Sequence, residues 1–255
     1  MNPDWLIPQW SAPASVRALC TSRAGGVSAG VYASLNLGDH VGDTAAAVAA
    51  NRMRLGRALG VRPVFLQQVH GTQVALLDRS TPDGRVADGC VSAQRDLACT
   101  ILVADCLPVL MTTGSGTVVA AAHAGWRGLA AGVLEATLQR LWRHAGSADP
   151  GAMARDTRVW LGPCIGPQAF VVGPEVRAAF VAQQPQASQC FAPHGHGKFL
   201  ADLAGLARQR LDAQGIGHIH GNDGGTQWCS ASRPSSFFSH RRDGVSGRMA
   251  ACIWL

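Results

Sequence analysis

The segment ACTILVADCLPVLM, residues 98–111, is a long apolar run with two polar side chains near its middle. Asp105 and Cys106 interrupt the run, and Pro108 follows them closely. An apolar run of this kind is typical of a strand that is buried on both faces. We therefore predict a buried strand that breaks at Asp105 and Cys106 and presents them to a functional site.

Similar apolar runs and amphipathic segments occupy most of the remaining chain. Residues 118–128, VVAAAHAGWRG, predict a second buried strand that ends in a glycine-rich turn. Residues 21–43 are rich in Gly, Ser and Asp and predict a long irregular loop. Four segments have helical spacing or helix start and stop signals: 45–60, 129–146, 173–183 and 198–215. Further short strands are expected at 64–71, 74–78, 158–166 and 249–255.

Helices and strands are thus mixed along the chain without strict alternation. This order favours an α+β fold over a doubly wound α/β sheet. The 30 glycines and 13 prolines are spread along the sequence rather than gathered into a linker. We therefore expect residues 1–255 to form a single domain.

Composition excludes several classes of protein. Hydrophobic residues make up 47% of the chain and charged residues 15%, which excludes a disordered protein. The N-terminus lacks a basic segment followed by a sustained apolar one, and no apolar stretch approaches the roughly 18–20 residues that cross a membrane. We expect a cytoplasmic protein whose eight cysteines are reduced, because a chain of this length does not need a disulfide scaffold.

The positive charge of the chain comes almost entirely from arginine. Lys and Arg number 22 against 16 Asp and Glu, and Lys198 is the sole lysine. Guanidinium groups suit bidentate recognition of phosphate or carboxylate. No basic run is longer than Arg241–Arg242, so a small anionic molecule is favoured over nucleic acid. The candidate phosphate-binding residues, in or beside glycine-rich turns, are Arg23, Arg127, Arg241 and Arg248.

Three of the predicted strands end in a His or Cys residue, namely His70, Cys106 and His123. Two imidazoles and one thiolate are a suitable ligand set for Zn²⁺, and three protein ligands leave a fourth position open, as in catalytic sites. The three residues are far apart in sequence, so only the tertiary fold can bring them together.

The same residues permit two other interpretations. His70 and His123 are equally compatible with hydrogen-bonded core histidines, and Cys106 with a small buried hydrophobe. Cys106 is also a candidate nucleophile with His123 or His70 as its base. Spacing alone does not choose among these interpretations, since no CxxC or HExxH motif supports a metal.

Six collinear motifs closely resemble those of the YfiH family, also called the laccase-domain, polyphenol oxidase or peptidoglycan-editing-factor family. The resemblance implies a zinc ion bound by His70, Cys106 and His123, and an α-β-β-α sandwich related to a bacterial cysteine deamidase. The sequence departs from the family at 170–173, Phe-Val-Val-Gly, where relatives usually carry an acidic residue. The motifs are TSRAGGVSAGVYASLNLGDHVGD (21–43), QQVHG (67–71), ADCLPVL (104–110), HAGWRG (123–128), GPCIGP (162–167) and FFSHRRDGVSGR (237–248).

The resemblance also implies a set of activities. These are phosphorolysis of adenosine, inosine and methylthioadenosine, deamination of adenosine, copper-dependent oxidation of phenols, and editing of peptidoglycan precursors. Deamination requires activated water and an acid/base group. Asp88 and Asp105 are candidates for that group or for residues that support the metal ligands. The HxE…PCxxC signature of zinc deaminases is absent from the chain.

A true multicopper oxidase requires a second, histidine-rich cluster in addition to a Cys/His₂ site. The chain has nine histidines, and two HxH pairs resemble metal-binding patterns. The pairs are His194 with His196 and His218 with His220, and both lie in predicted glycine-flanked loops that match none of the six motifs. We therefore expect them to be solvent-exposed histidines.

We interpret the chain as a zinc-dependent purine nucleoside phosphorylase with adenosine deaminase activity and minor phenol oxidation when copper is bound. The predicted catalytic residues are Asp105, Cys106 and His123, and the predicted small-molecule partners are a purine nucleoside and phosphate. Three alternatives stay open: a Cys106/His123 hydrolase or amidase that edits peptidoglycan precursors, a true polyphenol oxidase, and a metal-binding protein without turnover.

Overall fold

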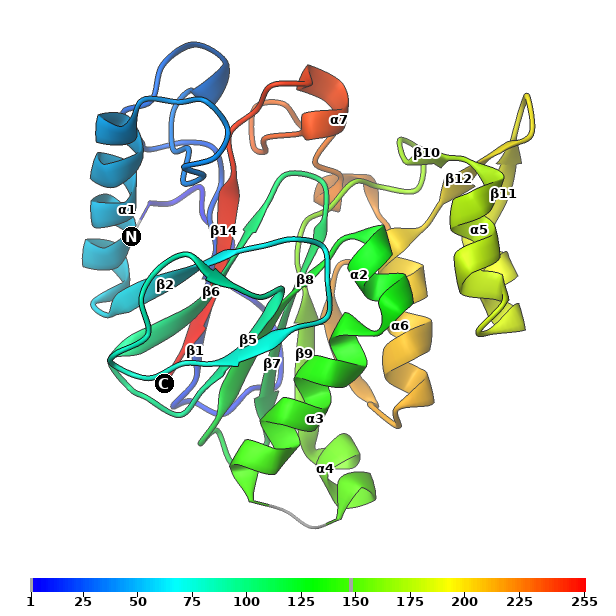
Figure 1. The fold of residues 1–255 in the computed structure, drawn as a ribbon, viewed down its shortest axis with the longest axis horizontal. Helices are drawn as coiled ribbons and strands as arrows, with labels where there is room; N and C mark the ends of the chain where they lie inside the picture. The colour runs from blue at the N-terminus through cyan, green and yellow to red at the C-terminus, as the bar shows by residue number, and fades with distance from the viewer. Residues whose placement is uncertain (1, 147–148) are drawn as a thin grey trace.

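Two β-sheets pack face to face in the computed structural model, which describes residues 2–146 and 149–255 (Figure 1). Helix α1 (Ala45–Leu59) covers the outer face of one sheet. Helices α3 (Val133–Ala145) and α6 (Leu203–Ala213) cover the outer face of the other. The chain therefore forms an α-β-β-α sandwich, which confirms the predicted fold class.

The two sheets have different strand orders. The five-stranded sheet runs in the order β1 (Arg17–Cys20), β14 (Met249–Trp254), β6 (Leu97–Val103), β2 (Arg62–Gln67) and β4 (Arg85–Val86). The six-stranded sheet runs in the order β13 (His218–Gly221), β9 (Thr157–Leu161), β7 (Leu107–Thr113), β8 (Val119–Ala124), β5 (Gly89–Ser92) and β3 (Val74–Leu76). A small third sheet lies beside helix α5 (Pro174–Val181) and contains β10 (Val171–Val172), β12 (Lys198–Ala201) and β11 (Phe191–His194) (Figure 1).

Side chains alternate in direction along each strand, and this alternation divides the apolar core into layers. Successive side chains of a strand point to opposite faces, so one strand serves two layers. In β14, Ala251 packs between the two sheets, whereas its neighbour Cys252 packs beneath α1. In β8, Ala120 and Ala122 pack toward the helices of the six-stranded sheet, while Ala121 faces the other sheet. These strands are buried on both faces, which explains their continuous apolar sequences.

The chain crosses from the five-stranded to the six-stranded sheet at two places that matter for function. Strand β6 ends at Val103 and β7 begins in the other sheet at Leu107. Strand β2 likewise ends at Gln67, and β3 begins in the other sheet at Val74. The predicted strand over 98–111 is thus two strands, and its predicted break is the crossing itself.

Several element boundaries differ from the sequence-based predictions. The predicted glycine-rich turn after β8 is the start of helix α2 (Trp126–Ala131). Gly132, with a φ of 101°, separates α2 from α3, so the predicted helix over 129–146 is two helices. Residues 198–201 form β12 rather than the start of a helix, because Asp202 caps α6 by accepting a hydrogen bond from Gly205 N at 2.9 Å.

The two HxH pairs were predicted to lie in loops, and the structure places three of their four histidines in strands. His218 and His220 belong to the edge strand β13 rather than to a loop, and His220 Nε2 lies 3.1 Å from Ser11 Oγ. His194 ends β11 and His196 lies in the turn that follows, where both side chains are exposed.

Among the described helices, none is long and apolar enough to span a membrane.

Residues 21–43 form the predicted irregular loop, with one short 3₁₀ helix at Gly30–Tyr32. The buried side chain of Asn51 in α1 anchors this loop. Its Nδ2 donates to the carbonyl oxygen of Asn36 at 2.8 Å and to Ser28 Oγ at 2.9 Å. Its Oδ1 accepts a hydrogen bond from Val27 N at 2.9 Å. One amide therefore satisfies polar groups along much of the loop.

We predict that Asn51→Ala lowers the free energy of unfolding by about 1–3 kcal/mol, because it leaves buried backbone groups of the loop without partners. Urea unfolding followed by circular dichroism measures the change. Arg57→Ala is the matched control on an exposed position of the same helix, and it should change stability by less than about 0.5 kcal/mol. Equal midpoints for the two variants would contradict the anchoring role of Asn51.

Candidate metal centre

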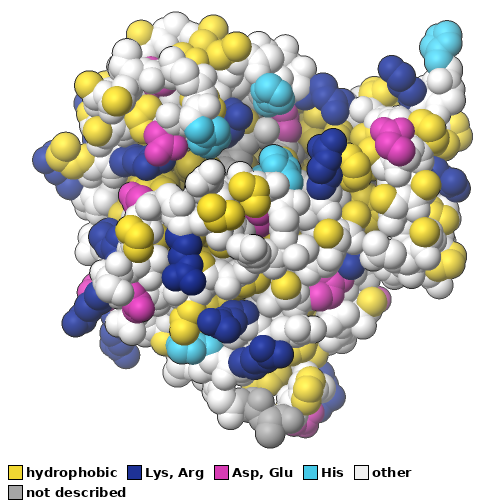
Figure 2. All heavy atoms as spheres, viewed as in Figure 1, with side chains coloured by type: hydrophobic (Ala, Val, Ile, Leu, Met, Phe, Trp, Pro, Cys, Tyr) yellow, Lys and Arg dark blue, Asp and Glu magenta, His cyan; other side chains and the backbone are white. Residues whose placement is uncertain are grey.

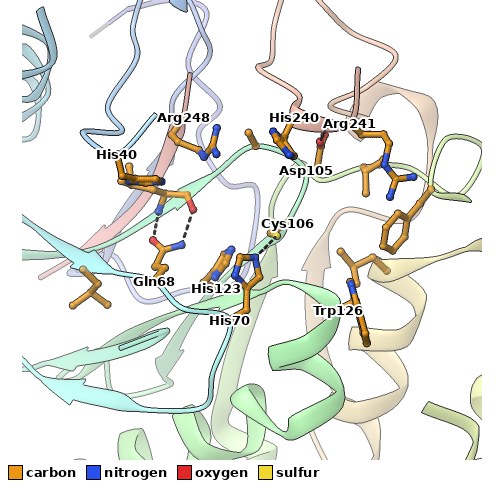
Figure 3. Close-up of a pocket in the computed structure, with 16 residues that line it drawn as sticks. His40, Gln68, His70, Asp105, Cys106, His123, Trp126, His240, Arg241 and Arg248 are labelled. Carbon is orange, nitrogen blue, oxygen red and sulfur yellow. Dashed lines mark hydrogen bonds between the residues drawn. The ribbon is translucent and has the colours of Figure 1, made fainter. Parts of the chain in front are cut away.

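The side chains of His70, Cys106 and His123 converge although they are distant in sequence. Their ligand atoms all lie within 4.8 Å of one another. His70 Nε2 is 3.6 Å from Cys106 Sγ, and the two imidazole rings are 4.8 Å apart between centroids. Among the described residues, this is the one group of three or more His, Cys, Asp or Glu with such geometry. Figure 3 shows the three side chains pointing toward one another.

The two sheet crossings explain this convergence. His70 lies in the crossing from β2 to β3, and Cys106 lies at the end of the crossing from β6 to β7. His123 lies in β8 at even spacing from Val119 and Ala121, which face the five-stranded sheet.

His70 and Asp105 have positive φ angles of 60° and 90°, a conformation that residues other than glycine rarely adopt.

The donor set fits a tetrahedral zinc ion, and so does the distance between two of its three donor atoms. Zinc–nitrogen and zinc–sulfur bonds of about 2.1 and 2.3 Å at a tetrahedral angle place the two donor atoms about 3.6 Å apart. The separation of His70 Nε2 and Cys106 Sγ matches this value. Cu²⁺ also binds imidazole and thiolate ligands, so the donor set alone does not distinguish the two metals.

The buried carboxylate of Asp88 holds both histidines. Its Oδ1 accepts hydrogen bonds from His123 Nδ1 at 2.8 Å and from the backbone N–H of His70 at 2.9 Å. Its Oδ2 accepts from the backbone N–H groups of Gly71 at 2.7 Å and Val69 at 3.1 Å. Since Nδ1 of His123 donates to Asp88, Nε2 is the ring nitrogen that remains for a metal or for Cys106. The sequence predicted Asp88 only as one of two candidate acid/base or supporting residues.

Two glycines of the HAGWRG motif are required by close packing at this site. A Cβ atom on Gly125 would lie 2.6 Å from His70 Cδ2 and 2.9 Å from Cys106 Sγ. A Cβ atom on Gly128 would lie 2.9 Å from the carbonyl oxygen of Gly71. Both positions therefore exclude any side chain, because α2 packs directly against two of the candidate ligands.

Electrostatics favour a charged Cys–His pair. Burial disfavours the thiolate of Cys106, but the positive charge of His123 and hydrogen bonds from both histidines outweigh it and lower the pKa of the thiol to about 6. Burial disfavours protonation of His123, but the Cys106 thiolate and the Asp88 carboxylate raise the pKa of His123 to about 9. The thiolate is the form of cysteine that binds metals and attacks electrophiles.

The three side chains line a cavity of about 340 Å³. Histidine and arginine side chains gather around its mouth (Figure 2). His40 and Arg248 lie on one side of the cavity, and Trp126 lies on the opposite side (Figure 3). Trp126 packs against an apolar cluster that contains three other lining residues, Ile165, Phe170 and Leu203, so this part of the lining is apolar.

The predicted arginines divide into two pairs. Arg241 and Arg248 line the cavity, whereas Arg23 and Arg127 do not. Arg23 donates to the carbonyl oxygens of Ala33 and Pro234 at 2.9 Å each. The exposed Arg127 lies over the ring of Trp126, with 4.4 Å between the guanidinium carbon and the ring centroid.

Asp105 lines the cavity, but its carboxylate is already bonded on both oxygens. Oδ1 accepts from Ser230 Oγ at 2.5 Å, and Oδ2 accepts from the backbone N–H of Arg241 at 2.6 Å. The bond from Arg241 holds helix α7 (His240–Asp243) beside the cavity. The sequence-based reasoning missed His40 and His240 as cavity residues, although both lie in motifs that it had singled out.

We predict that Asp88→Asn weakens metal binding about 10- to 100-fold, because the carboxylate no longer orients His123 or the backbone around His70. Competition with a chromophoric zinc chelator measures the affinity. Asp212→Asn, an exposed change in α6, is the matched control and should bind metal like the wild-type chain. Equal affinities for both variants would show that Asp88 does not support the site.

Comparisons with known proteins agree with this fold. Residues 17–255 match the family described as multi-copper polyphenol oxidoreductase laccase. The chain is 51% identical to a purine nucleoside phosphorylase of Pseudomonas aeruginosa and 46% identical to the purine nucleoside phosphorylase YfiH of Escherichia coli, with 98% of each chain covered. The crystal structure of Neisseria meningitidis protein NMB0706 superposes with a TM-score of 0.88 at 44% identity, over 99% of both chains. The chain therefore belongs to the YfiH family of laccase-like proteins.

Proposed function

We propose that this chain is a zinc-dependent purine nucleoside phosphorylase that acts on adenosine, inosine and methylthioadenosine. The observation that carries the proposal is a His/Cys/His cluster in a cavity whose lining includes two arginines and the aromatic side chains of Trp126 and Phe170. Relatives that match nearly the whole chain are named purine nucleoside phosphorylases, which supports the same reaction. We propose a cytoplasmic location, where the eight free cysteines stay reduced.

Phosphorolysis of inosine joins a phosphate oxygen to C1′ of the ribose and breaks the bond from C1′ to N9. The electron pair of the broken bond leaves on the purine, and the proton lost by hydrogen phosphate balances the proton that the purine gains. The protein must therefore hold an anion beside the ribose and a planar base on its other side. Both requirements match the chemistry of the residues that line the cavity.

We propose separate roles for the residues at the site. His70, Cys106 and His123 would hold the zinc ion, which when bound supplies Lewis-acid stabilisation of negative charge. Asp88 orients the ring of His123 and fixes the backbone at His70. Asp105 holds the backbone of Arg241 and so acts as a positioning residue beside the substrate.

Adenosine deamination and copper-dependent phenol oxidation are proposed as secondary activities of the same cavity. A true multicopper mechanism is less well supported, because the part of the chain that the structure describes contains a single candidate cluster. Such enzymes use a second, histidine-rich cluster for the reduction of oxygen.

A second candidate function is a cysteine hydrolase or amidase that acts on peptidoglycan precursors. It is favoured by the arrangement of Cys106, His123 and Asp88, in which a thiol faces a histidine that a carboxylate orients. This is the arrangement of a nucleophile, its base and an orienting group. The zinc site and the nucleophile use the same thiol, so the two functions make opposite predictions about metal removal.

Zinc-loaded wild-type protein should convert inosine and phosphate into hypoxanthine and ribose 1-phosphate. Cys106→Ala should lose both bound zinc and this activity, because the site loses its thiolate ligand. A coupled assay for hypoxanthine and elemental analysis of the same samples measure the two properties. Cys190→Ala, which alters a half-buried thiol that does not line the cavity, should keep both. Absence of hypoxanthine from zinc-loaded wild type would refute the phosphorylase proposal.

Alkylation distinguishes the two candidate functions. In metal-free protein, the lowered pKa of Cys106 should make its reaction with iodoacetamide rise through about pH 6 and level off by pH 7, whereas an ordinary thiol reacts faster up to about pH 9. Bound zinc should protect Cys106 from alkylation, and chelation should abolish turnover. Turnover of a muropeptide that survives chelation but is lost on alkylation of Cys106 would favour the hydrolase instead. Mass spectrometry locates the label.

A further inference from the structure

Arg248 is built into the wall of the cavity by its neighbours. Its backbone N–H donates to Asn36 Oδ1 at 2.9 Å, and the same oxygen accepts from Gly38 N at 2.9 Å. The side chain then passes over Gly38, where a Cβ atom would lie 2.7 Å from Arg248 Cγ. The irregular loop and the C-terminal motif therefore meet at one point to place this guanidinium.

One side of the Arg248 guanidinium donates hydrogen bonds to the protein, and the other side is available to a ligand. Nη1 donates to the carbonyl oxygens of Ser246 at 2.8 Å and Gly247 at 3.1 Å. Among the described residues, neither Nε nor Nη2 has a hydrogen-bond partner. Nε and Nη2 together form an edge that binds two oxygens of one phosphate or carboxylate. The guanidinium points into the cavity (Figure 3).

The charge of Arg248 is not neutralised within the described protein. No carboxylate lies within 4.0 Å of its guanidinium, whereas Arg52, Arg210 and Arg242 each have an acidic partner at that range. Burial lowers the pKa of Arg248, although Cys106 and Asp105 partly offset this effect. A half-buried cation without a partner is costly unless an anion binds beside it.

The neighbouring charges agree with an anion at this position. His40 lines the cavity on the same side as Arg248 (Figure 3). The carboxylate of Asp39 lies 3.1 Å from Arg52 Nη2 and 3.4 Å from His40 Nδ1, so its charge is paired with Arg52, and Nε2 of His40 remains for a ligand. Arg241 is the other arginine of the cavity, but it is exposed, and its guanidinium carbon lies 5.3 Å from the ring of Phe170 on the apolar side.

We infer that Arg248, assisted by His40, is the binding site for inorganic phosphate, and that the purine base lies on the opposite side of the cavity against Trp126 and Phe170. This inference rests on the proposed phosphorylase function and assigns the two substrates to opposite sides of the candidate metal cluster. Phosphate bound by Arg248 would then reach C1′ from the side opposite to the departing purine. The half-buried ring of Trp126 suits stacking of a planar base, and the buried Phe170 adds apolar surface beside it.

Titration calorimetry of zinc-loaded protein with inorganic phosphate, without nucleoside, tests the site apart from turnover. Arg248→Gln should weaken phosphate binding by about tenfold or more, because charged hydrogen bonds are lost. Arg248→Lys should restore part of the affinity through its charge but not the bidentate contact. Arg143→Gln, an exposed change in α3, is the matched control and should bind like wild type.

Kinetics provide the second readout. Arg248→Gln should raise KM for phosphate about tenfold or more while KM for inosine changes less than about threefold, and Trp126→Ala should have the opposite pattern. If Arg248→Gln does not fold, His40→Gln replaces it and should weaken phosphate binding about threefold. Unchanged phosphate binding in Arg248→Gln, or a rise confined to KM for inosine, would overturn the assignment. If phosphate binding depends on Arg248 but no hypoxanthine is produced, the anion site is supported and the phosphorylase function is refuted.

Discussion

The candidate site depends on the carboxylate of Asp88. Four hydrogen bonds reach its two oxygens, one from the ring of His123 and three from the backbone of residues 69–71. The three backbone bonds stabilise the left-handed conformation of His70, which would otherwise be costly. One buried anion therefore orients the imidazole of His123 and fixes the backbone that carries His70, while its burial is compensated by the groups that it holds. The two histidines share a support, so they cannot be positioned independently.

The architecture of the sandwich explains why a cavity lies next to this site. Two chain crossings between the sheets, at 68–73 and 104–106, carry His70 and Cys106 beyond the ends of the packed strands. The interior of the sandwich is filled by apolar side chains, so polar chemistry is confined to the end where the crossings lie. Helix α2 can approach the ligands there only because Gly125 and Gly128 have no side chain. The long loop and the C-terminal motif then enclose the cavity by bringing in His40 and Arg248.

Sequence patterns predicted the local features of this arrangement better than the long-range ones. The break at Asp105 and Cys106 was recognisable because polar residues interrupt an apolar run, and helix α1 was recognisable from its composition and Gly60. The pairing of strands into two sheets has no local signal, so the crossings could not be predicted. The helix predicted from residue 198 was wrong at its start, because pairing with β11 overrides helical propensity there. Arg23 was grouped with the cavity arginines because a glycine-rich setting does not reveal which way a side chain points.

The proposed metal site consists of His70, Cys106 and His123, is held by Asp88 and leaves one coordination position open. X-ray absorption at the zinc edge of the native protein tests this claim most directly. We expect one sulfur at about 2.3 Å and three nitrogen or oxygen atoms at about 2.0–2.1 Å, two of them with the outer-shell scattering of imidazole. A spectrum without a sulfur neighbour, or one with two or more sulfur neighbours, would contradict it.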